Sequence, residues 1–377
     1  MRLMPLFALL LCLSVHSLGY AQSYSKDYLQ LPALTNPGKT DSQLLALAHA
    51  GSRLVTAGER GLILYSDDEG QNWQQARVPV SQTLTALTFV GSEHGWAVGH
   101  GGVILHSGDG GASWQLQFDG NEANRQWLAY AQDQHAALEQ RVQDAPTEQR
   151  SELEYQLEDA AFAVEDAQEA ITKAPADPFL DVWFANENLG FAVGAYGMLY
   201  KTENSGLQWR LAISGISNPD RFHYNGITAN QTGKLFISGE AGLLYRSEDR
   251  GVSWQRLALN YDGSLFGVLA LGPETVLCYG LRGNVFRSDD SGDNWAAVPI
   301  EGTDRLSLYA ASEHANGNIV LVGAGGALLS SSDSGRHFVS EIHSSRYTFS
   351  AVTSSGDDLL LTGMSGLLRI PAAGSTR

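Results

Sequence analysis

An eight-residue pattern, Ser-x-Asp-x-Gly-x-x-Trp, recurs along this chain and constrains its fold more than any other feature of the sequence. Its six copies begin at Ser66, Ser107, Thr202, Ser247, Ser288 and Ser331. Their third position holds Asp68, Asp109, Asn204, Asp249, Asp290 and Asp333. Apart from one wider gap, successive copies lie about 40 residues apart, a period typical of propeller blades. The pattern therefore predicts a repeat protein.

A second pattern, Gly-x-x-Gly followed by an apolar strand, precedes each of these copies and occurs once more near the end of the chain. Its seven copies begin at Gly58, Gly99, Gly194, Gly239, Gly280, Gly323 and Gly363. Such glycine pairs mark tight turns between strands, where positive φ carries no steric cost. Each repeat then contains four short strands, as a propeller blade does. The predicted fold class is all-β: a seven-bladed β-propeller with an inserted antiparallel α-helical hairpin.

The seventh repeat, from Gly363 to Ile370, ends after its third strand. A blade that lacks its outer strand leaves an open sheet edge, which proteins usually pair or cover. The segment from Tyr28 to Leu34 belongs to no repeat. We therefore predict that it supplies the fourth strand of the last blade and ties the two ends of the propeller together.

The eight-residue motif corresponds to an Asp box, and its chemistry is predicted to be local. The Ser and Asp side chains can satisfy backbone N–H groups of a turn, the Gly takes a left-handed conformation, and the Trp packs the turn against the blade. A row of metal-binding carboxylates is the alternative, but Asn204 replaces one Asp without loss of the repeat. We predict a structural role for the motif, with no metal ion and no cofactor.

One gap in the repeat, between Trp114 and Trp209, is more than twice the usual period. Within it, residues 121–175 contain no glycine and are rich in Ala, Glu and Gln. Apolar and seam positions alternate in steps of three and four, at Leu128, Ala131, His135, Leu138 and Val142 and again at Leu153, Leu157, Ala160, Val164, Ala167 and Ile171. This heptad spacing predicts an antiparallel coiled-coil hairpin between the second and third blades, with the helices separated at Pro146.

The hairpin is acidic, with twelve acidic residues against four basic ones. Tyr155 and Phe162 lie one heptad apart and fall outside the apolar seam. These two rings either pack on the propeller or form a stripe that binds a partner, and both interpretations stay open. His135 is interpreted as a seam residue rather than as a metal ligand.

Arginines recur just before the inner strands of the fourth, sixth and seventh blades, at Arg221, Arg305 and Arg346. Arg60 and Arg282 lie in Gly-x-x-Gly turns. We predict that all five lie on the face opposite the Asp boxes, near the central channel, on the same face as the hairpin. A guanidinium cluster of this kind is a candidate site for a carboxylate or a phosphate. The alternative is that the arginines pair with nearby acids such as Asp220 or Asp304.

The N-terminus has the pattern of a secretory signal peptide over residues 1–21, with Arg2 before an apolar run and a cleavage site near Ala21. A membrane-anchoring helix is the alternative, but the run is short for one. The mature chain, residues 22–377, would keep only Cys278 and so could form no internal disulfide. A net charge of -17 argues against a nucleic-acid partner. We predict a periplasmic protein that does not insert into the membrane.

The sevenfold Gly-x-x-Gly and Asp-box pattern, with aromatic-led inner strands and arginines between blades, resembles the photosystem II assembly and stability factor family of bacterial-neuraminidase-repeat propellers. The resemblance implies a non-enzymatic chaperone for a membrane subunit, with an arginine patch that Arg221, Arg305 and Arg346 would form here. The long hairpin departs from the compact photosynthetic members. Related propellers of other bacteria look like accessories of membrane complexes, including transporters of the resistance-nodulation-division type. The expected partner is a membrane protein or a membrane-protein complex.

A sialidase-like glycoside hydrolase is the rival interpretation. It is favoured by the Asp boxes and by the run from Leu368 to Pro371, which is similar to the Arg-Ile-Pro signature of sialidases. That signature normally opens the catalytic domain, whereas here it closes the chain. Sialidases also need three substrate-clamping arginines, a nucleophilic Tyr with its Glu, and a general acid. No such constellation is found in the sequence, so no catalytic residue is predicted.

Overall fold

The computed structural model describes residues 29, 31–35, 39–173, 175–302, 305–314 and 317–371. The predicted signal peptide, residues 1–21, and Asp304 lie outside these ranges.

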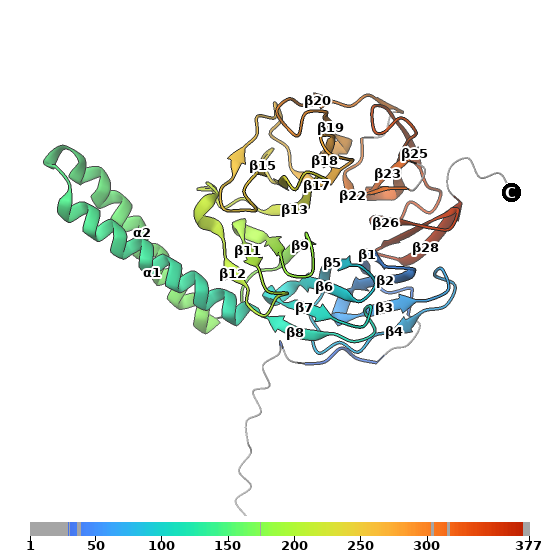
Figure 1. Ribbon diagram of the computed structural model, residues 1–377, viewed down its shortest axis with the longest axis horizontal. Coiled ribbons are helices and arrows are strands. Elements are labelled where there is room, and N and C mark those ends of the chain that lie inside the picture. Colours follow the sequence, from blue (N-terminus) through green and yellow to red (C-terminus); the bar gives the residue numbers. More distant parts are fainter. Residues whose placement is uncertain are drawn as a thin grey trace, which may run out of the picture.

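In the described part of the chain, seven β-sheets stand in a ring, as the repeats predicted (Figure 1). The first contains β1 (Leu44–Ala50), β2 (Arg53–Gly58), β3 (Ile63–Ser66) and β4 (Gln74–Gln75). The second contains β5 (Leu84–Val90), β6 (His94–Gly99), β7 (Ile104–Ser107) and β8 (Gln115–Phe118). The third contains β9 (Phe179–Phe184), β10 (Gly190–Gly194), β11 (Leu199–Thr202) and β12 (Arg210–Leu211). The fourth contains β13 (Tyr224–Ala229), β14 (Leu235–Gly239), β15 (Leu244–Ser247) and β16 (Gln255–Arg256).

Of the remaining three sheets in the described chain, the fifth has four strands, the sixth has five and the seventh has three. The fifth contains β17 (Leu265–Ala270), β18 (Val276–Gly280), β19 (Val285–Ser288) and β20 (Ala296–Ala297). The sixth contains β21 (Ile300–Glu301), β22 (Leu308–Glu313), β23 (Ile319–Gly323), β24 (Ala327–Ser331) and β25 (Phe338–Ile342), with β21 parallel to β25. The seventh contains β26 (Phe349–Ser355), β27 (Asp358–Gly363) and β28 (Gly366–Pro371).

The hydrophobic core lies between neighbouring blades, because each sheet buries residues from both of its faces. Between the second and third blades, for example, the ring of Trp96 stacks on that of Phe184, with centroids 3.6 Å apart. The buried second strand of each blade is almost entirely apolar, as in the run Val276–Gly280 of β18. Strands buried on both faces read as continuous apolar runs, and this is what the sequence shows.

The two glycines of each Gly-x-x-Gly turn serve different purposes, and the first blade illustrates both. Gly58 has an extended backbone, and a Cβ atom there would lie 2.0 Å from the carbonyl oxygen of Gln43. Glu59 donates its backbone N–H to that same carbonyl, so the close approach is part of the turn. Gly61 has φ of 72°, in the left-handed region that glycine adopts at no steric cost.

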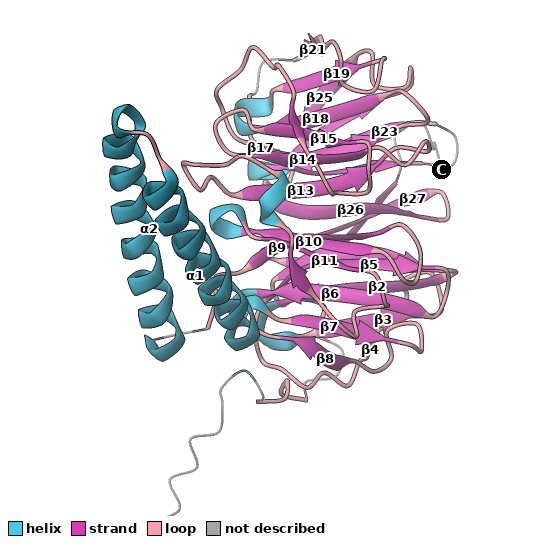
Figure 2. Cartoon of the chain, turned by 60° about the vertical axis from the view of Figure 1, so that its left-hand side comes forward, coloured by secondary structure: helices cyan, strands magenta, loops and turns pink. Residues whose placement is uncertain are grey.

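These turns form short 3-10 segments, five of which are Glu59–Gly61, His100–Gly102, Ala195–Gly197, Leu281–Gly283 and Ala324–Gly326. A further 3-10 turn, Ile213–Gly215, follows β12. Figure 2 shows such helical turns on the side of the disc where the long hairpin stands. We call this side the turn face, and the side formed by the Asp-box turns the box face.

The insertion between β8 and β9 is a pair of α-helices, α1 (Gly120–Asp144) and α2 (Thr147–Lys173), close to the predicted range 121–175. Asp119 caps α1, since its carboxylate accepts the backbone N–H groups of Asn121 and Glu122. The helices run antiparallel, because Asn124 at the start of α1 donates to the carbonyl of Ala170 near the end of α2.

The contact between the two helices uses the predicted seam, where Ala131, Leu153 and Ala167 are buried. The seam residue His135 is partly buried, with its Nδ1 3.9 Å from a carboxylate oxygen of Glu139. No helix of the described chain combines the length and the hydropathy that crossing a membrane requires.

We predicted that residues 28–34 supply the fourth strand of the last blade. The described residues of this segment, 29 and 31–34, do not do so, and for them the prediction is wrong. The last sheet has three strands there, and the N-terminal segment lies against the first blade instead. Ala33 donates its N–H to the carbonyl of Val78, and the Leu34 carbonyl accepts from the side chain of Gln75. Leu29 is fully buried in the core of the first two blades. The segment therefore buries the apolar side chain of Leu29 without forming a strand of the sheet. Tyr28 lies outside the described residues.

Candidate functional site

The Asp boxes form closed hydrogen-bonded turns. In the first box, the Ser66 hydroxyl donates to the Asp68 carboxylate at 2.8 Å and accepts the N–H of Gly70 at 2.8 Å. Asn72 donates its backbone and side-chain N–H groups to the same carboxylate. These bonds, those from Asn72 first, lower the pKa of Asp68 to about 2. The carboxylate is thus occupied by its own turn.

The remaining boxes repeat this geometry. Asn204 accepts from the Thr202 hydroxyl at 3.1 Å and from the N–H of Gln208 at 2.9 Å, so its amide oxygen replaces the carboxylate oxygen. The carboxylates that accept from their own turns are those of Asp109, Asp249, Asp290 and Asp333. Among the described residues, no group of three or more His, Cys, Asp or Glu side chains is placed to hold a metal ion.

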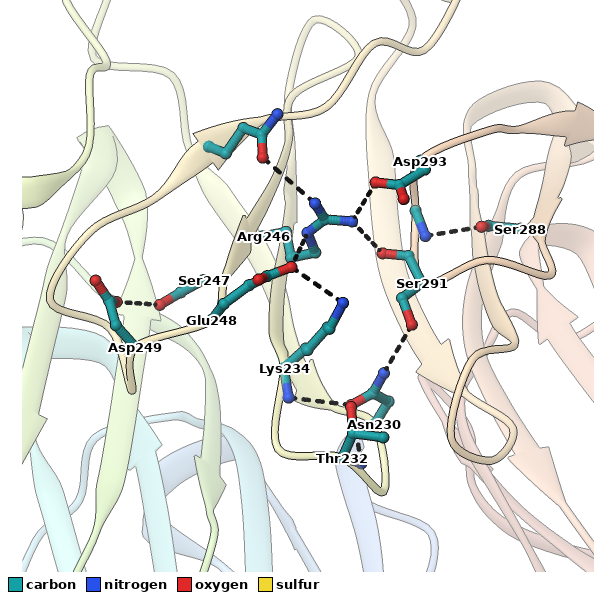
Figure 3. Close-up of polar contacts among 12 residues, drawn as sticks. Asn230, Thr232, Lys234, Arg246, Ser247, Glu248, Asp249, Ser288, Ser291 and Asp293 are labelled. Carbon is teal, nitrogen blue, oxygen red and sulfur yellow. Dashed lines mark hydrogen bonds and ion pairs between the residues drawn. The ribbon is translucent and has the colours of Figure 1, made fainter.

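On the box face, arginines join neighbouring blades. Arg246 donates to the Ser291 carbonyl at 2.9 Å and to the Asp293 carboxylate at 2.6 Å, as Figure 3 shows. Glu248 holds the other side of the guanidinium group, 3.2 Å from its Nε. Arg53, Arg287 and Arg369 reach the corresponding carbonyls of Gly110, Ser334 and Glu69.

Arg369, which the sialidase interpretation had singled out, therefore has a structural contact. It lies on β28 of the last blade and donates to the carbonyl of Glu69 in the box of the first blade. Ser355 donates its hydroxyl to the same carbonyl at 2.7 Å. The guanidinium group also lies 3.2 Å from the Asp358 carboxylate. These contacts connect the two ends of the ring.

The five arginines that the sequence analysis selected lie elsewhere, and all are exposed. In the described part of the chain none of them forms an ion pair, and Asp220 does not pair with Arg221. Four have left-handed backbones, with φ between 52° and 57°: Arg60, Arg221, Arg282 and Arg346. A non-glycine residue in this region is destabilised, roughly by 1 kcal/mol or more. Tyr196 and Ala241 have the same conformation at the positions equivalent to Arg60 and Arg282, so the turn itself sets it.

The arginines lie at four different boundaries between blades. Arg60 lies in the turn that packs on Val80, at the boundary of the first and second blades. Arg282 and Arg305 come together, because a Cβ on Gly283 would lie 3.5 Å from the Arg305 Cα. Arg346 lies against the turn at Gly326, between the sixth and seventh blades.

Arg221 contacts the hairpin. Its guanidinium carbon lies 5.1 Å from the ring centroid of Trp127 on α1 and 5.9 Å from that of Tyr196. Such distances are typical of cation–π contacts. A cavity of about 200 Å³ at this point is lined by both the helices and the third blade, with Asp166 and Asp177 among its residues. Sequence reasoning missed Trp127, since nothing along the chain connects it to Arg221.

Exposed aromatic side chains accompany the arginines on the turn face. Tyr196 occupies the left-handed position of its turn, Tyr309 follows the first residue of β22, and Tyr347 follows Arg346. The Tyr309 ring packs on Phe266 of the neighbouring blade, with centroids 5.3 Å apart. Arginine and tyrosine are the residue types enriched at protein–protein interfaces.

Tyr155 and Phe162 do not pack on the propeller, because both are largely exposed on α2. The interpretation that they rest against the blades is therefore wrong. The packing interpretation failed because the hairpin touches the disc only near its base. There, Gln126 donates to the Trp209 carbonyl and accepts from the N–H of Leu211.

Asp181 is a second residue that sequence reasoning missed. It lies on the inner strand β9, where the corresponding positions of the other blades hold Ala or Gly. Its carboxylate accepts the N–H of Val182 and, across the blade boundary, that of Ile227, each at 2.8 Å. Burial raises its pKa to about 6.

Comparisons with known proteins agree with the propeller fold. The family model described as Photosynthesis system II assembly factor YCF48 matches residues 66–131 and 164–307. No curated protein matches the sequence. A solved structure of YCF48 bound to D1 peptide is 17% identical, with a TM-score of 0.58, over 91% of this chain and 99% of that one.

Two further solved structures share the fold. YCF48 from Cyanidioschyzon merolae is 14% identical, with a TM-score of 0.60, over 90% of this chain and 98% of that one. The WD40 propeller domain of Doa1 is 10% identical, with a TM-score of 0.60, over 92% of this chain and 97% of that one. At these identities the structures establish the propeller fold alone. Because the family model covers more than half of its 377 residues, the chain belongs to the YCF48 family of photosystem II assembly factors.

Proposed function

We propose that this chain is a non-catalytic, protein-binding assembly or stability factor for a membrane-protein complex, acting in the periplasm through its turn face. The observation that carries the proposal is the set of exposed arginines without ion pairs in the described chain, four of them in left-handed conformations. Exposed guanidinium groups without an ion pair inside the described chain are available to bind a carboxylate or phosphate of another molecule.

Membership of the YCF48 family supports protein binding, and one solved relative holds a D1 peptide. By analogy, the partner proposed here is a segment of a membrane protein with carboxylates that the guanidinium groups can bind. The partner classes to test are a photosystem II subunit and a transporter of the resistance-nodulation-division type. The structural contacts of Arg369 and of the Asp boxes support the non-catalytic proposal against the sialidase alternative.

The test replaces arginines on the turn face and compares them with arginines elsewhere. The variant Arg282→Gln/Arg305→Gln/Arg346→Gln removes three charges that make no ion pair in the described structure. The control Arg250→Gln/Arg256→Gln/Arg336→Gln removes three exposed charges away from the turn face. Both variants should keep the melting temperature of the parent within about 2 °C, since surface substitutions change stability little.

Periplasmic crosslinking followed by affinity capture and mass spectrometry then measures binding. The turn-face variant should recover at least tenfold less of the membrane partner, because charge-assisted bonds are each worth about 1.5–3 kcal/mol. The control should capture as much as the parent. Equal losses in both variants, or a turn-face variant that is unstable, would contradict the proposal. Cell fractionation of the full-length chain tests the location, and recovery in the cytoplasm would contradict it.

Arg221 is tested separately because it contacts Trp127. If it binds the partner directly, Arg221→Lys should weaken capture while the hairpin stays in place. If it only holds the hairpin, the same substitution should increase proteolysis at the hairpin base and leave capture unchanged.

A further inference from the structure

Helix α2 carries two large aromatic side chains on its solvent side. Tyr155 is 70% exposed and Phe162 is 57% exposed. They lie seven residues apart, so they share one face of the helix at a separation of about 10 Å along its axis. Figures 1 and 2 show the hairpin extending beyond its contact with the disc. The propeller does not cover this face.

Acidic residues surround both rings. The helical neighbours three and four positions from Phe162 are Glu158, Asp159, Glu165 and Asp166, so all four are acids. Tyr155 has Glu152, Glu158 and Asp159 at the same distances. In the described structure Glu158, Asp159 and Glu165 form no ion pair. We call these seven residues the acidic-aromatic stripe.

The residues of the acidic-aromatic stripe lower the stability that α2 would have as an isolated helix. Like charges three or four residues apart destabilise a helix, and aromatic residues are poorer helix formers than alanine. Exposed rings also leave apolar surface in water. In the described chain no ion pair of Glu158, Asp159 or Glu165 offsets the repulsion between these charges, which points to an external partner.

We propose that the acidic-aromatic stripe is a second docking surface, which binds a basic segment of the partner protein. An aromatic face flanked by carboxylates suits a Lys or Arg side chain, since the ring attracts the cation and the carboxylate pairs with it. Two basic residues about 10 Å apart match the two rings, as at positions i and i+7 of a helix. The net charge of the hairpin, with twelve acids against four bases, complements such a segment and repels anionic lipid surfaces.

This inference rests on the proposed function only in taking the partner to be a protein. The stripe is separate from Arg282, Arg305 and Arg346, while its residue Asp166 also lines the cavity at Arg221. The purified chain, residues 22–377, is titrated into a fluorescent helical 14-residue peptide of Leu and Lys, and anisotropy is measured. The double variant Tyr155→Ser/Phe162→Ser should bind this peptide at least tenfold more weakly. The double variant Tyr309→Ser/Tyr347→Ser, which removes two exposed rings from the turn face, should bind as the parent does.

A second variant separates the rings from the charges. Glu158→Gln/Asp159→Asn/Glu165→Gln keeps both rings and should also weaken binding tenfold. Helix content is checked by circular dichroism for each variant. Unchanged affinity in the Tyr155/Phe162 variant, or equal binding of a peptide with Glu in place of Lys, would overturn the proposal. A loss confined to the Tyr309/Tyr347 variant would do the same.

Two further measurements test whether a second copy of the chain or a lipid surface binds the stripe instead. Sedimentation velocity detects a dimer, and a dimer that the Tyr155/Phe162 variant dissolves would assign the stripe to a second copy and overturn the proposal. Binding to phosphatidylglycerol vesicles that this variant abolishes would overturn it in favour of a lipid surface. The Arg282/Arg305/Arg346 variant should still bind the Lys peptide. A result that contradicts the stripe proposal can therefore be told apart from one that contradicts the proposed binding by the turn face.

Discussion

Arginine has different roles on the two faces of this propeller, and the difference originates in the backbone around it. On the box face, Arg246 is buried and donates to the Ser291 carbonyl of the next blade. On the turn face, Arg60 and Arg282 stand exposed in left-handed conformations. A buried guanidinium group must be satisfied by fixed acceptors, whereas an exposed one is free to bind a partner.

At the Asp boxes we predict that the turn needs an acceptor oxygen more than a negative charge. Asp249→Ala should lower the free energy of unfolding by about 1 kcal/mol, because solvent can replace part of the lost bonding from Ser253. Asp249→Asn should lose less than half of that, as Asn204 maintains the third box. Urea unfolding of both variants is the measurement. An equal loss in both variants would indicate that the charge itself matters.

The same bonds set the response to acid. Hydrogen bonds lower the pKa of Asp249 and of Asp290 to about 2 each, with those from Ser253 and Asn294 leading. A depressed folded-state pKa gives stability above the unfolded pKa near 4, which is lost as the pH falls toward 2.

Asp181 should give the opposite dependence on pH. Burial raises its pKa to about 6, so the folded state favours the protonated form. Stability from this group is full below the unfolded pKa near 4 and is lost as the pH rises through 6. The parent should therefore gain about 1 kcal/mol relative to Asp181→Ala when the pH falls from 7.5 to 5. Urea unfolding at the two pH values checks this, and parallel changes in both proteins would refute it.

At the scale of elements, the helical hairpin is a separable unit whose two ends meet. Ala176 donates its N–H to the Gly120 carbonyl at 3.2 Å, so joining these residues requires little movement of the propeller. The hairpin contributes some stability at its base, where Tyr200 donates its hydroxyl to the Ala123 carbonyl.

We predict that deleting residues 121–175 and joining Gly120 to Ala176 gives a folded propeller. Unfolding should cost about 2 kcal/mol less than in the parent, because a few buried hydrogen bonds and the Ala123 packing are lost. Circular dichroism and thermal melting test this. A cooperative β transition is expected, and an aggregated or unfolded product would show that the blades depend on the helices.

At the scale of the whole molecule, side chains join the ends of the ring, and the described part of the last blade has no fourth strand. Arg369 and Ser355 of the last blade share the Glu69 carbonyl of the first. His49 and the Ser354 carbonyl make a further contact across this boundary, at 3.0 Å.

Arg369→Gln should therefore weaken the ring at its closure. We predict a loss of about 2 kcal/mol in unfolding free energy, as expected when charge-assisted bonds to the Glu69 carbonyl and the Asp358 carboxylate are removed. Hydrogen exchange should rise in β1 and in β26 to β28 before it rises elsewhere. The exposed residue Arg256, replaced by Gln, is the control. Uniform exchange across all blades would contradict a local role for Arg369.

The sequence by itself determined the number of blades, the place of the hairpin and the bonding of the Asp boxes. Each depends on residues within a few positions of one another, as Ser66, Asp68 and Gly70 do, and repetition makes such patterns visible. The contact of Arg221 with Trp127, the carboxylate that Asp181 places across a blade boundary, and the closure through Arg369 were decided only by the tertiary structure. These contacts join residues 46 to 300 positions apart, and their partners are fixed by how whole blades pack around the ring.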